Sequence, residues 1–131
     1  TANQLHTIPI ALRDRMEIIE VNGYTIDEKI EIGRRHLVPK QIMENGIKKS
    51  DFKLNNKVLE KLIETYTAES GVRGLEKRIS KLVRSRAIAI ASDEPIDAEI
   101  KLDELNKILG PSYEKQKYID NSIAGVVTGL A

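Results

Sequence analysis

Two arginines, Arg15 and Arg73, stand where a cation could do chemistry. A guanidinium is planar, permanently charged and able to bind a phosphate or a carboxylate through two parallel hydrogen bonds. Arg73 lies in the first turn of a predicted long helix, where a positive charge opposes the helix dipole at a cost of roughly 0.3–1 kcal/mol. That placement suggests an anion outside the helix. Arg15 lies between Asp14 and Glu17 just before an apolar stretch, so its simpler interpretation is an ion pair at a strand edge.

The predicted long helix also carries a row of cations. Arg73, Lys77, Lys81 and Arg84 share one helix face, at steps of four, four and three residues. One interpretation is a solvated face beside Glu76, and the other is contact with nucleic acid or another acidic surface. The chain has only five aromatic residues, four Tyr and one Phe, and none interleaves with these cations. A stacking platform for single strands is therefore unsupported.

Several other kinds of site are excluded by the residues that are missing. The 131 residues include no Cys, and the two His residues, His6 and His36, are thirty positions apart, which is too sparse for a zinc cage. No Gly-x-x-x-x-Gly-Lys-Ser/Thr loop is present to hold a triphosphate. Twenty-one Lys and Arg oppose twenty Asp and Glu, so the net charge of +1 disfavours a protein that coats a polyanion. No stretch approaches the ~20 apolar residues of a membrane helix.

The apolar periodicity predicts which elements must position these side chains. Helices are expected over residues 26–38, 58–66, 72–92 and 103–109, where apolar residues recur at helical spacing. Thr25 and Glu28 have the spacing of a capping box, and Asn55 or Asn56 can cap the second helix. Short strands are expected over residues 16–21 and 96–102. The predicted fold is mainly α, a bundle of about four helices with two short strands.

The last residues of the sequence, 123–131, are apolar and resemble a buried strand rather than a polar, frayed end. Residues 111–122 are polar and resemble a linker. We therefore expect the chain to be a segment of a longer protein.

In their order and spacing, several motifs resemble the ATP-dependent Lon protease family almost from end to end. The stretches that carry the resemblance are Thr1-Ala2-Asn3, Thr7-Ile8-Pro9, Leu12-Arg13-Asp14-Arg15-Met16-Glu17, Gly23-Tyr24-Thr25-x-x-Glu28-Lys29, Arg35-His36-Leu37-Val38-Pro39-Lys40-Gln41, Tyr66-Thr67-x-Glu69-x-Gly71-Val72-Arg73-x-Leu75-Glu76 and Gly125-Val126-Val127-Thr128-Gly129-Leu130-Ala131.

The resemblance implies four parts of the chain. Residues 1–22 would be the C-terminal end of the α/β nucleotide-binding core of an AAA+ ATPase, and residues 23–110 its small helical lid, or α-domain. Residues 111–122 would be a linker, and residues 123–131 the start of a proteolytic domain. A hinge at residues 22–23 would let the lid rotate.

Three residues would then take roles in ATP hydrolysis. Asn3 would be the first sensor, which orients the attacking water. Arg15 would be the arginine finger, inserted into the nucleotide site of the neighbouring subunit. Arg73 would be the second sensor, which contacts the γ-phosphate of ATP in its own subunit. Such cations suit phosphoryl transfer, because catalysis there is mainly positioning and stabilisation of spread negative charge.

The same resemblance implies an ATP-dependent serine endopeptidase that unfolds and degrades misfolded and regulatory proteins. Its ATP and Mg²⁺ would be bound by the full-length parent, and the isolated segment would be inactive. Its partners would be neighbouring subunits of a homohexameric ring and unfolded protein substrates, with no membrane, in the bacterial cytoplasm rather than the mitochondrial matrix. The alternative function is a DNA-binding module that uses the basic face of helix 72–92, with Lys77, Lys81 and Arg84 as contacts. A lid from a different AAA+ machine is disfavoured by the Gly-Val-Val-Thr-Gly-Leu-Ala motif.

Overall fold

The computed structural model describes residues 2, 4–95 and 97–112. The described elements, in chain order, are η1 (Leu5–Thr7), α1 (Ile10–Arg13), α2 (Ile26–Ile32), η2 (Gly33–Leu37), α3 (Val38–Glu44), η3 (Lys49–Asp51), α4 (Asn56–Tyr66), α5 (Arg73–Ala91) and α6 (Leu102–Leu109). The prediction of a mainly helical fold is confirmed.

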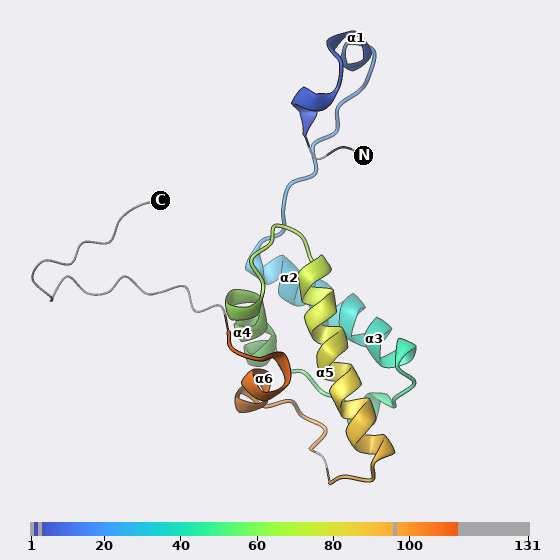
Figure 1. The fold of residues 1–131 in the computed structure, drawn as a ribbon, viewed down its shortest axis with the longest axis vertical. Helices are drawn as coiled ribbons and strands as arrows, with labels where there is room; N and C mark the ends of the chain where they lie inside the picture. Colours follow the sequence, from blue (N-terminus) through green and yellow to red (C-terminus); the bar gives the residue numbers. More distant parts are fainter. Residues whose placement is uncertain (1, 3, 96, 113–131) are drawn as a thin grey trace, which may run out of the picture.

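Helices α2 to α6 pack around one hydrophobic core, with α5 against α3, α4 and α6 (Figure 1). The apolar stripes predicted for α4 and α5 supply most of the core, which also takes residues from the chain after α5. The largest fully buried side chains are those of Leu59, Leu62, Leu75, Ile79, Leu82, Val83, Ile100 and Leu105. The N-terminal segment with η1 and α1 extends away from this bundle, from the end where α2 begins.

Two of the predicted helix caps form as the sequence indicates. The Thr25 amide donates to the Glu28 carboxylate at 2.8 Å, and the Glu28 amide donates to the Thr25 hydroxyl at 3.3 Å. The Thr25 amide and the Thr25 hydroxyl, the latter at 3.1 Å, both donate to the Glu28 carboxylate and lower the pKa of this carboxyl from its ordinary value of 4.5, because they stabilise its charged form. At the start of α4, the Val58 amide donates to the Asn55 side chain at 2.8 Å. Both caps satisfy amides that would otherwise lack a partner.

The helix predicted over residues 26–38 continues past Pro39 to Glu44 through a π-helical turn, η2. Proline has no amide hydrogen to donate and its ring crowds the carbonyl one turn earlier, so a wider turn ahead of it relieves both problems. Gly33 begins this turn, where a Cβ atom would lie 3.0 Å from Leu59 Cδ2. The glycine therefore costs helix propensity but lets α2 and α4 approach closely.

Both strand predictions that fall on described residues are wrong. Residues 16–21 form no strand, and Ile19 and Val21 are 78% and 86% exposed. Their β-branched side chains favour an extended chain, but in the described part of the molecule no second strand pairs with it. Of the strand expected over residues 96–102, the described residues form a single parallel bridge between Lys53 and Glu99. The strand expected over residues 123–131 and the first-sensor candidate Asn3 lie outside the described residues.

Candidate functional site

Arg73 is the first residue of α5, and its side chain is exposed. Among the described residues it forms no ion pair, although α5 begins beside an acidic residue, Glu69. The Glu69 carboxylate instead accepts hydrogen bonds from the amides of Gly74 and Leu75, at 2.8 Å each. The helix start thus has its own anion, and the Arg73 guanidinium remains available to another one.

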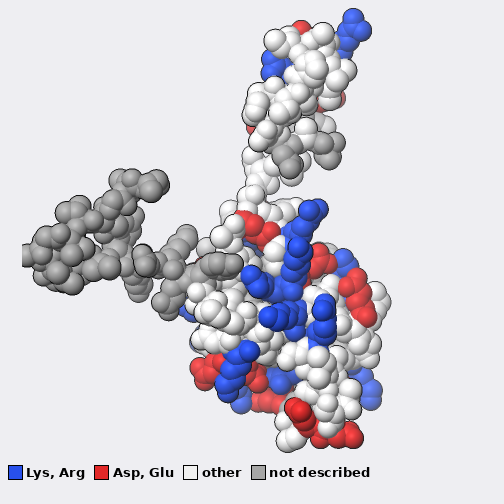
Figure 2. All heavy atoms as spheres, in the orientation of Figure 1, with Lys and Arg blue, Asp and Glu red and all other residues white. Residues whose placement is uncertain are grey.

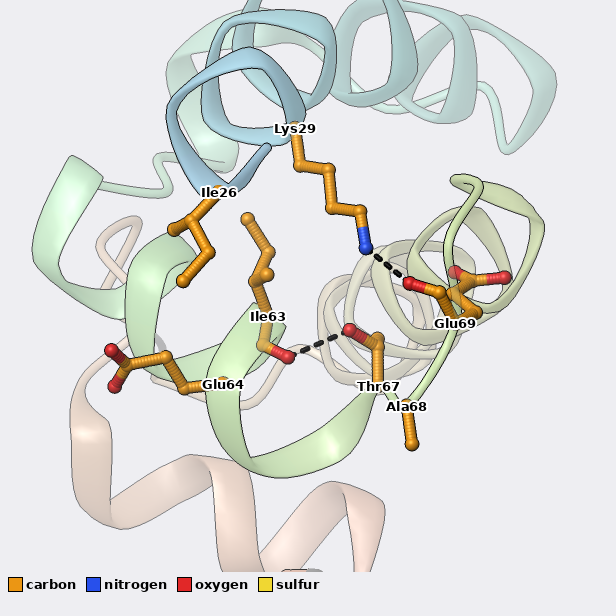
Figure 3. Close-up of a pocket in the computed structure, with 7 residues that line it drawn as sticks. All are labelled: Ile26, Lys29, Ile63, Glu64, Thr67, Ala68 and Glu69. Carbon is orange, nitrogen blue, oxygen red and sulfur yellow. Dashed lines mark hydrogen bonds between the residues drawn. The ribbon is translucent and has the colours of Figure 1, made fainter. Parts of the chain in front are cut away.

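The loop before α5 is attached to α2 and to the chain that precedes α2. The Lys29 ammonium donates to the main-chain carbonyl of Glu69, and the Tyr24 amide donates to the Ser70 carbonyl at 2.9 Å. Figure 3 shows Lys29 reaching from α2 toward this loop. A pocket of about 550 Å³ lies beside these contacts. Its lining residues are Ile26, Lys29, Ile63, Glu64, Thr67, Ala68 and Glu69.

Arg15 lies in the turn after α1, and its side chain is exposed. Its amide donates to the Leu12 carbonyl at 3.1 Å, so the backbone turn is held locally. The described residues show no ion pair from Arg15 to Asp14 or Glu17, so the interpretation as a strand-edge ion pair is wrong. The segment that carries Arg15 extends away from the bundle, and the structure does not bring Arg15 and Arg73 into one site (Figure 1).

The predicted basic face of α5 is present and exposed. Lys77, Lys81 and Arg84 are all exposed, and Figure 2 shows the blue Lys and Arg side chains gathered over this helix. They line an open hollow of about 510 Å³ together with Gly74, Arg78 and Ser80. Glu76 does not neutralise this face, because its carboxylate pairs with Lys40 of α3 at 2.7 Å.

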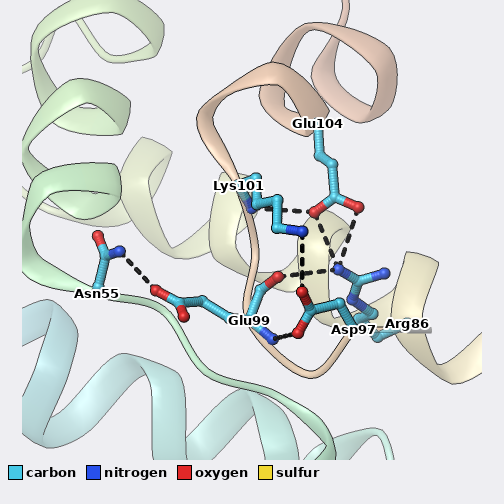
Figure 4. Close-up of polar contacts among 6 residues, drawn as sticks. All are labelled: Asn55, Arg86, Asp97, Glu99, Lys101 and Glu104. Carbon is cyan, nitrogen blue, oxygen red and sulfur yellow. Dashed lines mark hydrogen bonds and ion pairs between the residues drawn. The ribbon is translucent and has the colours of Figure 1, made fainter.

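A second polar cluster, which sequence reasoning missed, joins α5 to α6 (Figure 4). The Arg86 guanidinium is buried, with the residue 7% exposed, and it pairs with the Glu104 carboxylate at 2.9 Å. Beside it, Lys101 pairs with Asp97 at 3.0 Å, which lowers the pKa of Asp97 and raises that of Lys101. Arg86 continues the helical spacing of the buried residues Ile79, Leu82 and Val83 in α5. A charged residue at a buried position needs a partner, and this was the sequence signal for a buried ion pair. These contacts fasten α5 to α6 and to the chain between them.

Within the described ranges, no group of three acidic or histidine side chains is placed to hold a metal ion. The helices described are also too short or too polar to cross a membrane.

Comparisons with known proteins agree with this geometry. The family model described as "Lon protease AAA+ ATPase lid domain" matches residues 43–99. The chain is 54% identical over 131 residues to a Lon protease of Karelsulcia muelleri and 52% identical over 132 residues to one of Parabacteroides distasonis. Each match covers all of this chain. The chain spans about 15% of the length of the first relative and about 16% of the second.

A solved structure also matches, that of the SSD domain of Bacillus subtilis Lon protease. It is 39% identical, with a TM-score of 0.54, and the match covers 69% of this chain and 95% of that chain. The helical bundle is therefore a lid-type domain of the AAA+ ATPase class. The chain belongs to the Lon protease family.

Proposed function

We propose that this chain is the nucleotide-sensing lid of an ATP-dependent serine protease, with Arg73 as the second sensor. The observation that carries the proposal is the exposed Arg73 guanidinium at a helix start already capped by the Glu69 carboxylate. A cation that served only the fold would pair with that carboxylate. The Glu69 carboxylate is instead bound by backbone amides, so the Arg73 guanidinium is available to bind the anion of a ligand.

The chemistry of the side chain fits a γ-phosphate. The substrate ATP, with Mg²⁺, presents terminal oxygens that a planar guanidinium can bind through two hydrogen bonds. Arg73 would tie the lid to the nucleotide-binding core while that phosphate is attached, and would lose the contact after hydrolysis. The lid could then rotate about residues 22–23 as a rigid body. In a ring of six subunits, this motion would draw unfolded protein toward the protease chamber.

Arg15 and Asn3 complete the proposal within the core segment, residues 1–22. Arg15 would act on the nucleotide of the neighbouring subunit, and its exposed side chain on a short turn supports that role. Asn3 would orient the attacking water in its own subunit. Residues 23–110 would form the lid, residues 111–122 a linker and residues 123–131 the start of the protease domain. Because the relatives above are bacterial, we place the parent protein in the bacterial cytoplasm.

Arginine-to-alanine variants of the full-length parent test these roles. Arg15→Ala is expected to lower ATP turnover by on the order of 10³-fold, as removal of an arginine finger does elsewhere. Arg73→Ala should lower both ATP turnover and the preference for ATP over ADP. Arg84→Ala removes another exposed arginine of α5, so it is the matched control and should retain ATP turnover. Unchanged turnover in both test variants would remove the assigned roles.

A second candidate function is DNA binding, which the hollow on the basic face of α5 favours. Phosphate contacts by Lys77, Lys81 and Arg84 would make the affinity for duplex DNA fall steeply with salt. Each lost phosphate contact should reduce the slope of log K against log salt by about 0.9. The triple alanine variant and the native chain would be titrated against duplex DNA over a range of salt. Equal slopes, or no binding at low salt, would dismiss this function.

A further inference from the structure

We propose that Glu69 and Lys29 are positioning residues that hold Arg73 in place for its contact with nucleotide, an inference that rests on the proposed function. Glu69 orients the first turn of α5, and Lys29 fastens the Glu69 backbone to α2. Neither residue would touch the nucleotide itself.

The first turn of α5 has an unusual cap. Val72, the residue at the N-cap position, makes no side-chain hydrogen bond to the helix. The amides of Gly74 and Leu75 are instead bound by Glu69, which lies further back in the loop. Because one carboxylate bridges two successive amides, it fixes the direction in which the first turn starts. Its negative charge also offsets the positive end of the helix dipole, which would otherwise disfavour a cation at Arg73.

The Glu69 carboxylate fits closely against Gly74. A Cβ atom on Gly74 would lie 2.9 Å from Glu69 Oε1 and 3.0 Å from Glu69 Cδ. The glycine beside Arg73 therefore makes room for the carboxylate. A glycine in the first turn is a poor helix former, and the space that Glu69 occupies explains its presence.

The loop that carries Glu69 is attached to α2. Lys29 is only 7% exposed, and its ammonium donates to the Glu69 carbonyl. Burying a lysine is costly unless its charge is hydrogen-bonded, so breaking this contact would leave a buried charge without a partner. The next peptide is held by the Tyr24 amide, and a Cβ atom on Gly23 would lie 2.8 Å from Ser70 Cβ. The start of α5 is thus attached both to α2 and to the chain at residues 23–24, on the lid side of the hinge.

The alternative is that Glu69 and Lys29 only stabilise the fold. The two roles differ in a measurable way, because a residue that acts through Arg73 has nothing to act on once Arg73 is removed. The readout is the ratio of ATP affinity to ADP affinity, measured by displacement of a fluorescent nucleotide from the full-length protein.

We expect Glu69→Ala to lower this ratio by about fivefold or more, within the usual range of coupling between sites. Lys29→Met should lower it in the same direction. In an Arg73→Ala background, Glu69→Ala should cause no further change. Glu69→Gln keeps one acceptor oxygen and should recover part of the ratio. Glu64→Ala is the matched control, since Glu64 lines the same pocket from α4 and is exposed.

Thermal melting of each variant separates loss of fold from loss of position, and Glu69→Gln carries the test if Glu69→Ala does not fold. An equal loss with and without Arg73, or an unchanged ratio in a folded Glu69→Ala variant, would overturn the inference. An unchanged ratio in Arg73→Ala alone would instead refute the proposed function, and the positioning role would fall with it.

Discussion

Removal of the Glu104 carboxylate should destabilise the bundle more than removal of any exposed carboxylate. Glu104 supplies both oxygens to the Arg86 guanidinium, at 2.9 and 3.2 Å, and also accepts from the Lys101 amide at 3.0 Å. In Glu104→Ala the guanidinium would stay buried without its counter-charge. Its Nε atom already lacks a hydrogen-bond partner among the described residues.

The size of the effect follows from the burial of the pair. Breaking a buried ion pair by removing one partner costs about 3–5 kcal/mol, because an unpaired charge remains inside the protein. The Glu104 side chain is 29% exposed, so water can reach part of the site, and the lower end of that range applies. Loss of the cap at Lys101 adds about 0.5–1 kcal/mol. We therefore expect a loss of about 3–4 kcal/mol, equivalent to roughly 10–15 °C in melting temperature.

Urea unfolding of the 131-residue chain, followed by circular dichroism, measures this loss. Glu31→Ala is the matched control, because its carboxylate pairs with Arg34 and Arg35 but all three side chains are exposed. Its stability change should be close to zero. In an Arg86→Met background, Glu104→Ala should cost much less, since no buried charge is left unpaired. Equal losses for Glu104→Ala and Glu31→Ala, or the same loss with and without Arg86, would refute the reasoning.

Three further predictions concern the caps and the close approaches. Gly23→Ala should destabilise the chain by about 1–3 kcal/mol in thermal unfolding, because the new Cβ atom would lie 2.8 Å from Ser70 Cβ. Gly71→Ala is its control and should leave the stability unchanged, because a Cβ atom there would have nothing within 4 Å. Hydrogen bonds from Thr25 lower the pKa of Glu28 below 4.5, so this cap stabilises the fold above that pH and loses its effect as the pH falls through the lowered pKa. In urea titrations at several acid pH values, the free energy of unfolding should therefore fall less with pH in Glu28→Gln than in the native chain. Asn55→Ala should cost about 1 kcal/mol in urea unfolding, because it removes the 2.8 Å cap of α4.

Most of the helical fold could be predicted because it depends on local patterns. Caps need only a side chain a few residues from the amide that it binds, so Thr25, Glu28 and Asn55 are visible in the sequence. The buried stripe of α5 follows from the spacing of its apolar residues, and the observed helix, Arg73–Ala91, differs from the predicted range by one residue at each end. Such agreement is expected where local preference and packing favour the same structure.

The failures arise where a structure depends on distant partners. Residues 16–21 have the composition of a strand. A strand also needs a neighbouring strand to hydrogen-bond its backbone N–H and C=O groups, and the composition of one segment does not show whether such a neighbour exists. Among its described residues, the segment after α5 likewise forms a single bridge, to Lys53, before α6 begins. Last, the contact between Lys29 and Glu69 joins residues forty positions apart. No spacing rule links two such positions, although a lysine next to Ile30 on the inward face of α2 was a partial signal.

The depth of the core near Arg73 bears on how the lid could move. Leu75 lies two residues after Arg73 and is fully buried, so the core fixes the direction of α5 almost from its first residue. A pull on Arg73 would therefore act on the whole bundle rather than on a loose loop. Gly23 packs against Ser70, so it belongs to the same body. The proposed rotation of the lid would then use the N-terminal side of the hinge at residues 22–23, where residues 17–22 are exposed.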